Sequence, residues 1–407
     1  MDGPGAIGAS EFDALMAPLG PFGVAPVMVA GVSGGPHSLA LALLLARWAG
    51  ARGGRLVAGI VDHGLRDDSA AEASTVAGWM AARGIEARVE ALGLAPGPGM
   101  QARAREGRLA ALMRVCAAVG APWLALGQHR GDQAETLLLR GFAGSGPAGL
   151  AGMAAARSAG GVLVIRPLLG VAPARLEAVV AAAGLAPIRD PSNENSAFAR
   201  VRLRVALGDP VGEGPGVAAL AAAAAAFARR RVRSGEAVAA RIAQAARLHP
   251  EGFARLDLAA LGTDGMAVAA LAALLRVVSG AAFAPPRDAV AALLARGEGT
   301  LGGARLMRGG LLLREEAAMA PPVPALPGAR WDGRFVLEGR PPEGCVIGAL
   351  GDARLPRPPW LPAAVARTMP AIRRDTVLVA APGLSYPSSQ EHAACRLRFA
   401  PAGAACA

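Results

Sequence analysis

A glycine-rich turn with the sequence SGGPHS carries the first residues whose types are suited to chemistry. It occupies 33–38, between a short apolar run at 26–32 and a segment near 37–49 that has helical periodicity. Glycines let backbone amides approach an anion, and a helix that begins there directs the positive end of its dipole at that anion. The turn lacks the lysine of a Walker A loop and is not a GxGxxG motif. The alternative is a plain strand-to-helix connection.

A second polar pair, Asp62 and His63, ends the apolar run at 55–62. The alternative is a helix entry in which Asp68 or Ser69 is the N-cap residue. That alternative accounts for Asp68 and Ser69 but leaves Asp62 and His63 unexplained.

Two carboxylates follow another apolar run, at 122–127. Asp132 and Glu135 are three residues apart, so both project from one face of the first turn of a helix. There they are placed to meet Mg²⁺ or an amino group, or simply to complement the helix dipole.

A fourth segment, RDPSN at 189–193, is followed by Arg200, Arg202 and Arg204. A polar loop followed by arginines is suited to clamp phosphate or nucleic acid. The alternative is a turn that leads into an exposed strand.

Short apolar runs alternate with helical segments in the first third of the chain, which predicts βαβ units, an α/β fold and a parallel sheet. Ligands of such sheets bind beyond the carboxyl ends of the strands, which is where the polar segments fall. We expect strands at 26–32, 55–62, 85–92 and 122–127, and helices near 37–49, 69–83, 101–119 and 131–141.

The rest of the chain is less regular. We expect a loop-rich stretch at 143–205, a linker at 208–215, helices throughout 216–300, a β-hairpin at 299–316 and a small β-rich tail from 320. These expectations divide the chain into a catalytic domain at 1–207, a mainly helical domain at 208–318 and a small C-terminal region at 319–407.

The amino-acid composition indicates which binding partners and which cellular compartment to expect. The formal net charge is +11, and all 42 basic residues are arginines, which either reflects coding bias or indicates a polyanionic partner. The four cysteines form no CxxC pair, so neither a disulfide framework nor a zinc site is predicted. No apolar stretch is long enough to span a bilayer, and no secretory signal is recognisable. We therefore expect a cytoplasmic protein with no membrane association.

Taken in order, the segments resemble the tRNA(Ile)-lysidine synthase family, which are PP-loop ATP pyrophosphatases. The likeness covers residues 26–204 well and the tail only loosely. It is carried by SGGPHS (33–38), VDHGLR (61–66), AREGRL (104–109), QHRGDQAET (128–136), GSGPAGLAGM (144–153), RPLL (166–169) and DPSN (190–193).

The resemblance implies a PP-loop catalytic domain and a two-step reaction on the wobble cytidine of an isoleucine tRNA with a CAU anticodon. The C2 oxygen attacks the α-phosphate of ATP and pyrophosphate leaves; free L-lysine then displaces AMP at C2. ATP and Mg²⁺ are the implied cofactors, the helical domain and tail are expected to contact tRNA, and a homodimer is a possible assembly.

The resemblance also distributes roles among the residues. It implies catalysis by His129, Asp132 and Glu135, with Asp132 orienting the lysine amine and also serving as the candidate metal ligand. It implies ATP and pyrophosphate binding by Ser33, Gly34, Gly35, Pro36, His37 and Ser38. It places Asp62, His63 and Arg66 near the nucleotide, and Arg105, Arg108, Asn193, Arg200 and Arg202 at the tRNA or substrate.

Four positions depart from the family pattern. His37 replaces the loop aspartate, Gln128 a histidine, Gly131 the first aspartate of a pair, and Val201 an asparagine. A carboxylate suits Mg²⁺ better than an imidazole does. The alternatives are therefore a catalytically impaired homologue that binds tRNA or nucleotide, or a PP-loop ATP pyrophosphatase with another substrate. A thiolase that carries sulfur on paired cysteines is disfavoured because the chain has no CxxC.

Overall fold

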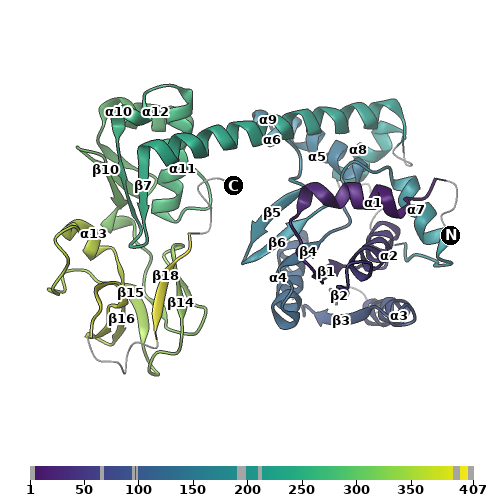
Figure 1. The fold of residues 1–407 in the computed structure, drawn as a ribbon, viewed down its shortest axis with the longest axis horizontal. Coiled ribbons are helices and arrows are strands. Elements are labelled where there is room, and N and C mark those ends of the chain that lie inside the picture. Colours follow the sequence, from purple (N-terminus) through teal and green to yellow (C-terminus); the bar gives the residue numbers. More distant parts are fainter. Residues whose placement is uncertain are drawn as a thin grey trace. The chain divides into compact units, whose positions relative to one another are not determined.

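The chain divides into two compact units, Met1–Arg231 and Val232–Ala407 (Figure 1). The computed structural model describes residues 5–64, 68–93, 97, 100–189, 199–209, 213–387 and 395–401. The predicted boundaries of three domains, at 207/208 and 318/319, stay predictions.

The first unit is built on a six-stranded sheet in the order β3-β2-β1-β4-β6-β5. All neighbouring strands are parallel except β5, which pairs antiparallel with β6 at the edge. The predicted α/β fold with a parallel sheet is therefore confirmed. The strands are β1 (Val27–Gly31), β2 (Arg55–Asp62), β3 (Glu86–Ala91), β4 (Trp123–Ala125), β5 (Ala156–Ala159) and β6 (Val162–Ile165).

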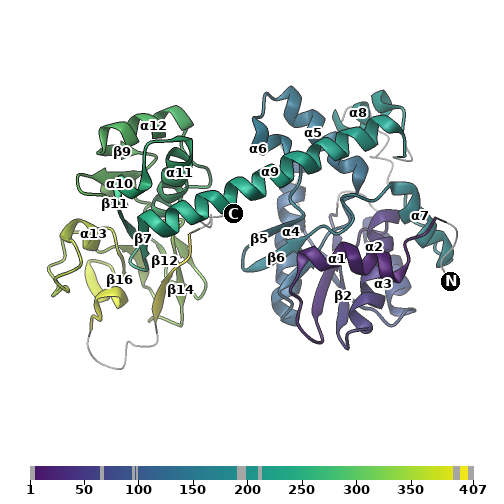
Figure 2. The same cartoon turned by 45° about the horizontal axis from the view of Figure 1, so that its top comes forward.

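The four helices predicted after the first four strands are present. They are α2 (Pro36–Gly50), α3 (Ser69–Ala81), α4 (Met100–Val119) and α5 (Arg130–Phe142). An N-terminal helix, α1 (Ala9–Met16), continues into the short η1 (Ala17–Leu19) and contacts α2, as both views show (Figure 2).

The prediction that 143–205 is loop-rich missed the regular elements in this stretch. This stretch contains β5 and β6 together with α6 (Pro147–Leu150), α7 (Pro173–Ala182) and α8 (Ala199–Leu207). The strands are only four residues long and meet at Gly160–Gly161, both with positive φ, so the run is too short and too glycine-rich for periodicity to reveal it. The arginines after RDPSN lie on α8, a helix rather than the exposed strand considered as an alternative.

Alternating side chains of the buried strands pack against helices on both faces of the sheet. Met28 and Ala30 of β1 join a core with α2, while Val29 between them joins a core with α4. Gly59 of β2 permits this closeness, because a Cβ there would lie 2.6 Å from Leu112 Cδ2 of α4. The sheet is thus fixed from both sides, and the carboxyl ends of its strands are held in place.

The long helix α9 (Pro215–Ala245) leads from the first unit into the second. Part of the region predicted to be helical, 246–256, forms the strands β7 and β8 instead, and the hairpin predicted at 299–316 is three strands. The five-stranded sheet of the second unit, in the order β7-β8-β11-β10-β9, contains all of these strands. They are β7 (Ala246–His249), β8 (Phe253–Leu256), β9 (Gly299–Leu301), β10 (Ala304–Met307) and β11 (Leu311–Arg314).

The helices α10 (Leu258–Leu261), α11 (Gly265–Ser279) and α12 (Arg287–Arg296) contribute to the core of this sheet. The predicted β-rich tail is confirmed by two small antiparallel sheets. One contains β12 (Val323–Pro324), β15 (Val346–Ala349), β16 (Pro370–Arg374) and β17 (Val377–Ala380), and the other β13 (Arg330–Trp331), β14 (Phe335–Glu338) and β18 (Arg396–Phe399). The remaining elements are η3 (Glu316–Ala318), α13 (Ala363–Arg367) and η4 (Pro382–Leu384).

None of the helices in the described ranges is both long enough and apolar enough to span a bilayer.

Candidate active site

The turn at 33–38 closes on itself through its two serines. The backbone N–H of Ser33 donates to Ser38 Oγ (3.1 Å), and the two hydroxyls are 3.3 Å apart. Ser38 Oγ also donates to the carbonyl of Gly35 (3.0 Å), the N-cap residue of α2. Two hydroxyls and a helix N-terminus are therefore gathered at one place, which suits an anion.

The two glycines of the turn serve different purposes. Gly34 has a φ of +81°, and a Cβ there would lie 2.7 Å from Val76 Cγ2 and 2.9 Å from Ile188 Cδ1. Gly35 has an ordinary φ of −70°, and a Cβ there would meet only Ser33 Oγ, at 3.7 Å. Gly34 is required by the fold, whereas Gly35 leaves open space for a ligand.

Because Gly127 has no side chain, the loop after β4 can pack closely against the turn at 33–38. A Cβ at Gly127 would lie 3.0 Å from the carbonyl oxygen of His37 and 3.2 Å from Ser38 Cα. Ile188 also contacts the turn, because its N–H donates to the carbonyl of Gly34 (2.9 Å). Segments far apart in sequence therefore meet at 33–38, as expected from the carboxyl edge of a parallel sheet.

His129 and Asp132 cap the N-terminus of α5. His129 Nδ1 accepts a hydrogen bond from Gly131 N–H (3.1 Å), and Asp132 Oδ2 accepts one from His129 N–H (3.0 Å). Gly131 permits this arrangement, since a Cβ there would lie 3.0 Å from His129 Cε1. The departure at Gly131 and the position of His129 are thus physically linked.

His37 packs edge-on against His129, with ring centroids 4.1 Å apart. Its Nε2 is buried and has no hydrogen-bond partner among the described residues. Burial, followed by the proximity of His129, lowers the pKa of His37 to about 4, against a tendency of Asp132 to raise it. His37 is therefore a neutral imidazole at physiological pH. The Oε1 atom of Gln128 is likewise buried without a partner in the described part of the chain.

Glu135 joins α5 to α8. Its side chain is 2% exposed, and Oε1 accepts from Arg204 Nη2 (2.9 Å) and Nε (3.0 Å). Arg200 Nη1 lies 3.5 Å from Glu135 Oε2 and 3.9 Å from Asp132 Oδ1. Burial raises the pKa of Glu135, which Arg204 opposes and Asp132 reinforces. These contacts are those of a residue that positions α8, and the catalytic role predicted for Glu135 stays a prediction.

Two further residues of α5 hold the segment at 144–153. Gln133 Nε2 donates to the carbonyl of Met153 (3.0 Å), and its Oε1 accepts from Met153 N–H (2.7 Å). Arg140 Nη1 donates to the carbonyls of Gly149 (2.8 Å) and Gly152 (2.7 Å). Helix α5 therefore organises the loop that follows it, through Gln133 of the motif QHRGDQAET and through Arg140.

Asp62 caps its own turn instead of contacting α5. Its Oδ1 accepts from Gly64 N–H (2.9 Å), and a hydrogen bond from the Ser69 hydroxyl, followed by that from Gly64, lowers the pKa of Asp62. Asp68 occupies the N-cap position of α3 without a side-chain capping bond. The structure thus explains Asp62 as a helix-entry residue, and its predicted place near the nucleotide stays a prediction, as does that of His63.

The predicted basic residues are distributed over two helices. Arg105 and Arg108 lie on α4, and Arg200 and Arg202 lie on α8. Arg105 is close enough to buried Arg166 to contribute, after burial and Arg157, to lowering its pKa to about 10. Arg66 and Asn193 fall outside the described residues.

Sequence reasoning did not single out Arg204 as a site residue or Ile188 at all. Arg204 is four residues after Arg200, the spacing that places two side chains on one helix face. Reading this stretch as a helix would have revealed it. Ile188 is an apolar residue in a loop, and nothing in its type indicates its contact with Gly34.

The described residues fit Mg²⁺ poorly. No group of three or more His, Cys, Asp or Glu side chains able to hold a metal occurs among them. Asp132 Oδ2 is used by His129 N–H, and Glu135 is paired with arginines. The metal-ligand role of Asp132 stays a prediction.

Comparisons with known proteins bear on the same region. A family model described as a PP-loop domain matches residues 9–210. The tRNA(Ile)-lysidine synthase of Methylobacterium sp. (strain 4-46) is 40% identical over 337 residues, which cover 80% of this chain and 92% of that protein.

Other relatives match over a shorter range. The tRNA(Ile)-lysidine synthase of Novosphingobium aromaticivorans is 48% identical over 42% of this chain and 53% of its own length. That of Bradyrhizobium diazoefficiens is 42% identical over 50% of this chain and 58% of its own length. The chain therefore spans little more than half the length of these two relatives.

Among solved structures, the U34-tRNA thiolase NcsA from Methanococcus maripaludis is similar to 54% of this chain and 78% of its own, with a TM-score of 0.44 and 17% identity. A likeness this low carries no argument for function.

Proposed function

The chain belongs to the tRNA(Ile)-lysidine synthase family, and on that premise we propose that it ligates lysine to C2 of the wobble cytidine of an isoleucine tRNA with a CAU anticodon. ATP is converted to AMP and pyrophosphate through an adenylated tRNA intermediate. The observation that carries the proposal is the 40% identity over 92% of the Methylobacterium synthase.

In the first step, the C2 oxygen of cytidine attacks the α-phosphate and pyrophosphate leaves. The Ser33 hydroxyl and the N-terminus of α2 are the donors that stabilise the charge of the departing pyrophosphate, and Ser38, whose hydroxyl donates to the Gly35 carbonyl, holds the turn in shape. Gly35 leaves room for the pyrophosphate beside these donors. His37, a neutral residue of the same turn, adds no positive charge there.

In the second step, the lysine amine displaces AMP at C2. Asp132 is the carboxylate that we assign to hold and orient this amine. The Oδ1 atom of Asp132 lies 3.9 Å from Arg200 Nη1, so this ion pair is loose. The Asp132 side chain is 20% exposed. Asp132 thus combines a fixed position, set by the cap, with access to a ligand.

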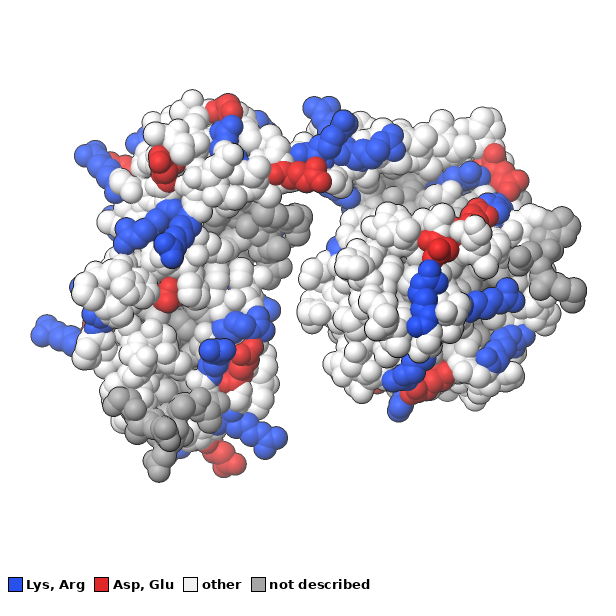
Figure 3. Space-filling model, viewed as in Figure 1, with Lys and Arg blue, Asp and Glu red and all other residues white. Residues whose placement is uncertain are grey.

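A basic surface supports the assignment of RNA as substrate. Arg229, Arg230 and Arg233 are exposed on α9, and Figure 3 shows basic side chains gathered along this helix. Arginines at such a surface neutralise phosphates and release counterions. Contacts of Arg105, Arg108, Asn193, Arg200 and Arg202 with tRNA, a homodimeric assembly and the use of Mg²⁺ all stay predictions.

Labelled lysine, ATP and an isoleucine tRNA transcript bearing the CAU anticodon test the proposal. We expect lysine incorporation into the tRNA with one pyrophosphate released per lysine. A transcript with uridine at the wobble position is the matched control and receives no lysine. Absence of incorporation into the CAU transcript, with intact binding of that tRNA, would contradict the proposal.

A second measurement separates the proposed enzyme from an impaired homologue. The variant His37→Asp places a carboxylate oxygen at the turn, and we expect it to raise pyrophosphate release if the histidine limits the first step. Salt-sensitive tRNA binding without any pyrophosphate release, in both proteins, would indicate the impaired homologue. Pyrophosphate release without lysine incorporation would indicate another substrate.

A further inference from the structure

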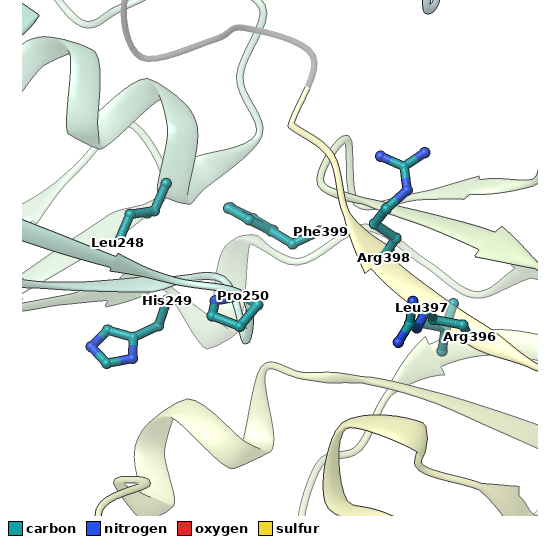
Figure 4. A pocket seen from close by; sticks show the side chains of 7 residues that line it. All are labelled: Leu248, His249, Pro250, Arg396, Leu397, Arg398 and Phe399. Atoms are coloured by element: carbon teal, nitrogen blue, oxygen red, sulfur yellow. The ribbon is translucent and has the colours of Figure 1, made fainter. Parts of the chain in front are cut away.

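A cavity of about 430 Å³ lies within the second unit. Its walls are the end of β7 with the following turn, 248–250, and the strand β18, 396–399. Figure 4 shows the Phe399 ring turned toward Leu248 and the Arg396 guanidinium turned toward Pro250. An aromatic ring and a cation thus face one opening.

The Phe399 ring, which forms the aromatic part of the cavity wall, packs against a buried ring of the core. Phe399 lies 5.4 Å, centroid to centroid, from Phe335, which is 1% exposed. Next to the cavity, His249 stacks on Phe253 at 4.2 Å with an interplanar angle of 8°, and Trp360 lies nearly parallel to His249 at 6.2 Å. Trp360 is 49% exposed, so this stack ends in a flat apolar surface that solvent reaches.

The charges around the cavity are mainly positive. Arg247, Arg255, Arg396 and Arg398 are all exposed, and Arg255 Nη2 donates to the carbonyl of Trp360 (3.2 Å). Arg398 is paired with Glu338, whereas Arg396 has no ion-pair partner in the described part of the chain. A free guanidinium that lines the cavity together with the half-buried Phe399 ring is suited to a ligand with a phosphate and a planar base.

Two polar atoms at the same turn also lack partners. His249 Nε2 and Glu251 Oε2 are buried without a hydrogen bond among the described residues. Buried polar atoms in folded proteins are normally paired, so these two indicate a missing group that can hydrogen-bond. The hydroxyls of a ribose and the edge of a base offer such groups.

From these observations we infer that the cavity between 248–250 and 396–399, with Trp360 beside it, binds an unpaired nucleotide of the RNA substrate. The base stacks on the exposed aromatic surface and the phosphate pairs with Arg396. Stacking and charge recognise an unpaired nucleotide without requiring a particular sequence. Because it names RNA as the partner, this inference rests on the proposed function.

Equilibrium binding of the isoleucine tRNA to the full chain tests the inference. We expect Trp360→Ala and Arg396→Glu each to weaken binding about tenfold, the size typical of one lost base stack. Arg308→Glu is the matched control for charge, because Arg308 is 86% exposed, is paired with Glu298 and does not line the cavity; we expect less than a twofold change. Trp360→Phe, which keeps a ring, should restore most of the affinity.

A blunt RNA duplex and AMP separate the sources of the nucleotide. Trp360→Ala should leave duplex binding unchanged, since a duplex offers no unpaired base. Equal weakening of tRNA and duplex, or no change in tRNA binding, would overturn the inference. The inference would also be overturned if Trp360→Ala lost affinity for AMP but kept its affinity for tRNA, because the cavity would then be a site for a free mononucleotide. Binding is read without catalysis, so Trp360-dependent tRNA affinity in a protein that forms no lysidine would overturn the proposed function alone.

Discussion

His37 combines burial with a titratable ring, so its effect on stability depends on pH. Its pKa is lowered from 6.5 to about 4 in the folded state, chiefly by burial. The unfolded chain therefore takes up a proton first as the pH falls, and folding loses stability between pH 6.5 and pH 4. We expect about 2 kcal/mol of this contribution to be lost between pH 7 and pH 5.

The variant His37→Gln isolates this contribution. Urea unfolding at pH 7 and pH 5 should show a smaller loss of unfolding free energy in the variant than in the original protein, by about 2 kcal/mol. All other titrating groups are common to both proteins and cancel. The same pH dependence in both would show that His37 is solvated in the folded state.

The two glycines of the turn at 33–38 should respond differently to alanine. Gly34→Ala places a Cβ within 2.7 Å of Val76 at a φ of +81°, so we expect a loss of about 1–3 kcal/mol in stability. Gly35→Ala has an ordinary φ and no close neighbour, so stability should be unchanged. Its methyl group occupies the space that we assign to pyrophosphate, and ATP affinity should fall. Calorimetric unfolding and ATP titration check both; equal stability losses would refute the distinction.

The contact between α5 and α8 rests on Glu135 and its arginines. Arg204→Ala leaves a carboxylate that is 2% exposed without its closest cation, and we expect a loss of about 1–3 kcal/mol. Glu135→Leu with Arg204→Ala should cost less than the sum of the single changes, since no unpaired charge stays buried. Urea unfolding measures the cycle, with Arg229→Ala on α9 as an exposed control. Additive effects would show that the pair is not coupled.

Sequence periodicity was sufficient for β1 to β4 of the six-stranded sheet and missed β5 and β6. The runs at 26–32 and 55–62 are apolar and flanked by helical segments, so β1 and β2 follow from local pattern alone. The strands β5 and β6 have four residues each, and β7 and β8 follow directly from an alanine-rich helix. Their pairing depends on distant partners, which a local pattern does not contain.

The candidate site was predictable where chemistry requires a particular residue type. The serines and glycines at 33–38 and the carboxylate of Asp132 are such cases. The packing of His37 on His129 depends on Gly127 and Gly131, whose importance is the absence of a side chain. Close approaches of this kind become visible only when the backbone positions are known.

At the scale of the whole molecule, each unit has a core of its own, so damage to one should spare the other. Asp332 in the second unit accepts from Arg314 and Arg334, whose side chains are 8% and 0% exposed. Burial tends to raise the pKa of Asp332, but the two arginines hold it below its usual value. Asp332 is thus the charged partner of two buried cations.

Asp332→Asn leaves these cations unbalanced, and we expect the second unit to lose about 3–5 kcal/mol. ATP affinity, which we assign to the first unit, should be retained. Calorimetry with and without ATP checks this, and Asp352→Asn is the control because Asp352 is 85% exposed. A parallel loss of ATP affinity would show that the two units unfold together.

The cap at the start of α5 also determines where one hydrogen atom resides. A ring nitrogen that accepts a hydrogen bond carries no hydrogen, so acceptance by Nδ1 of His129 leaves the hydrogen of the neutral ring on Nε2. That nitrogen lies 3.5 Å from Asp132 Oδ2. The backbone of Gly131 thereby selects a tautomer, and with it the direction in which this imidazole donates. A peptide N–H thus sets which ring nitrogen carries the hydrogen, and that nitrogen lies 3.5 Å from the carboxylate that we assign to hold the lysine amine.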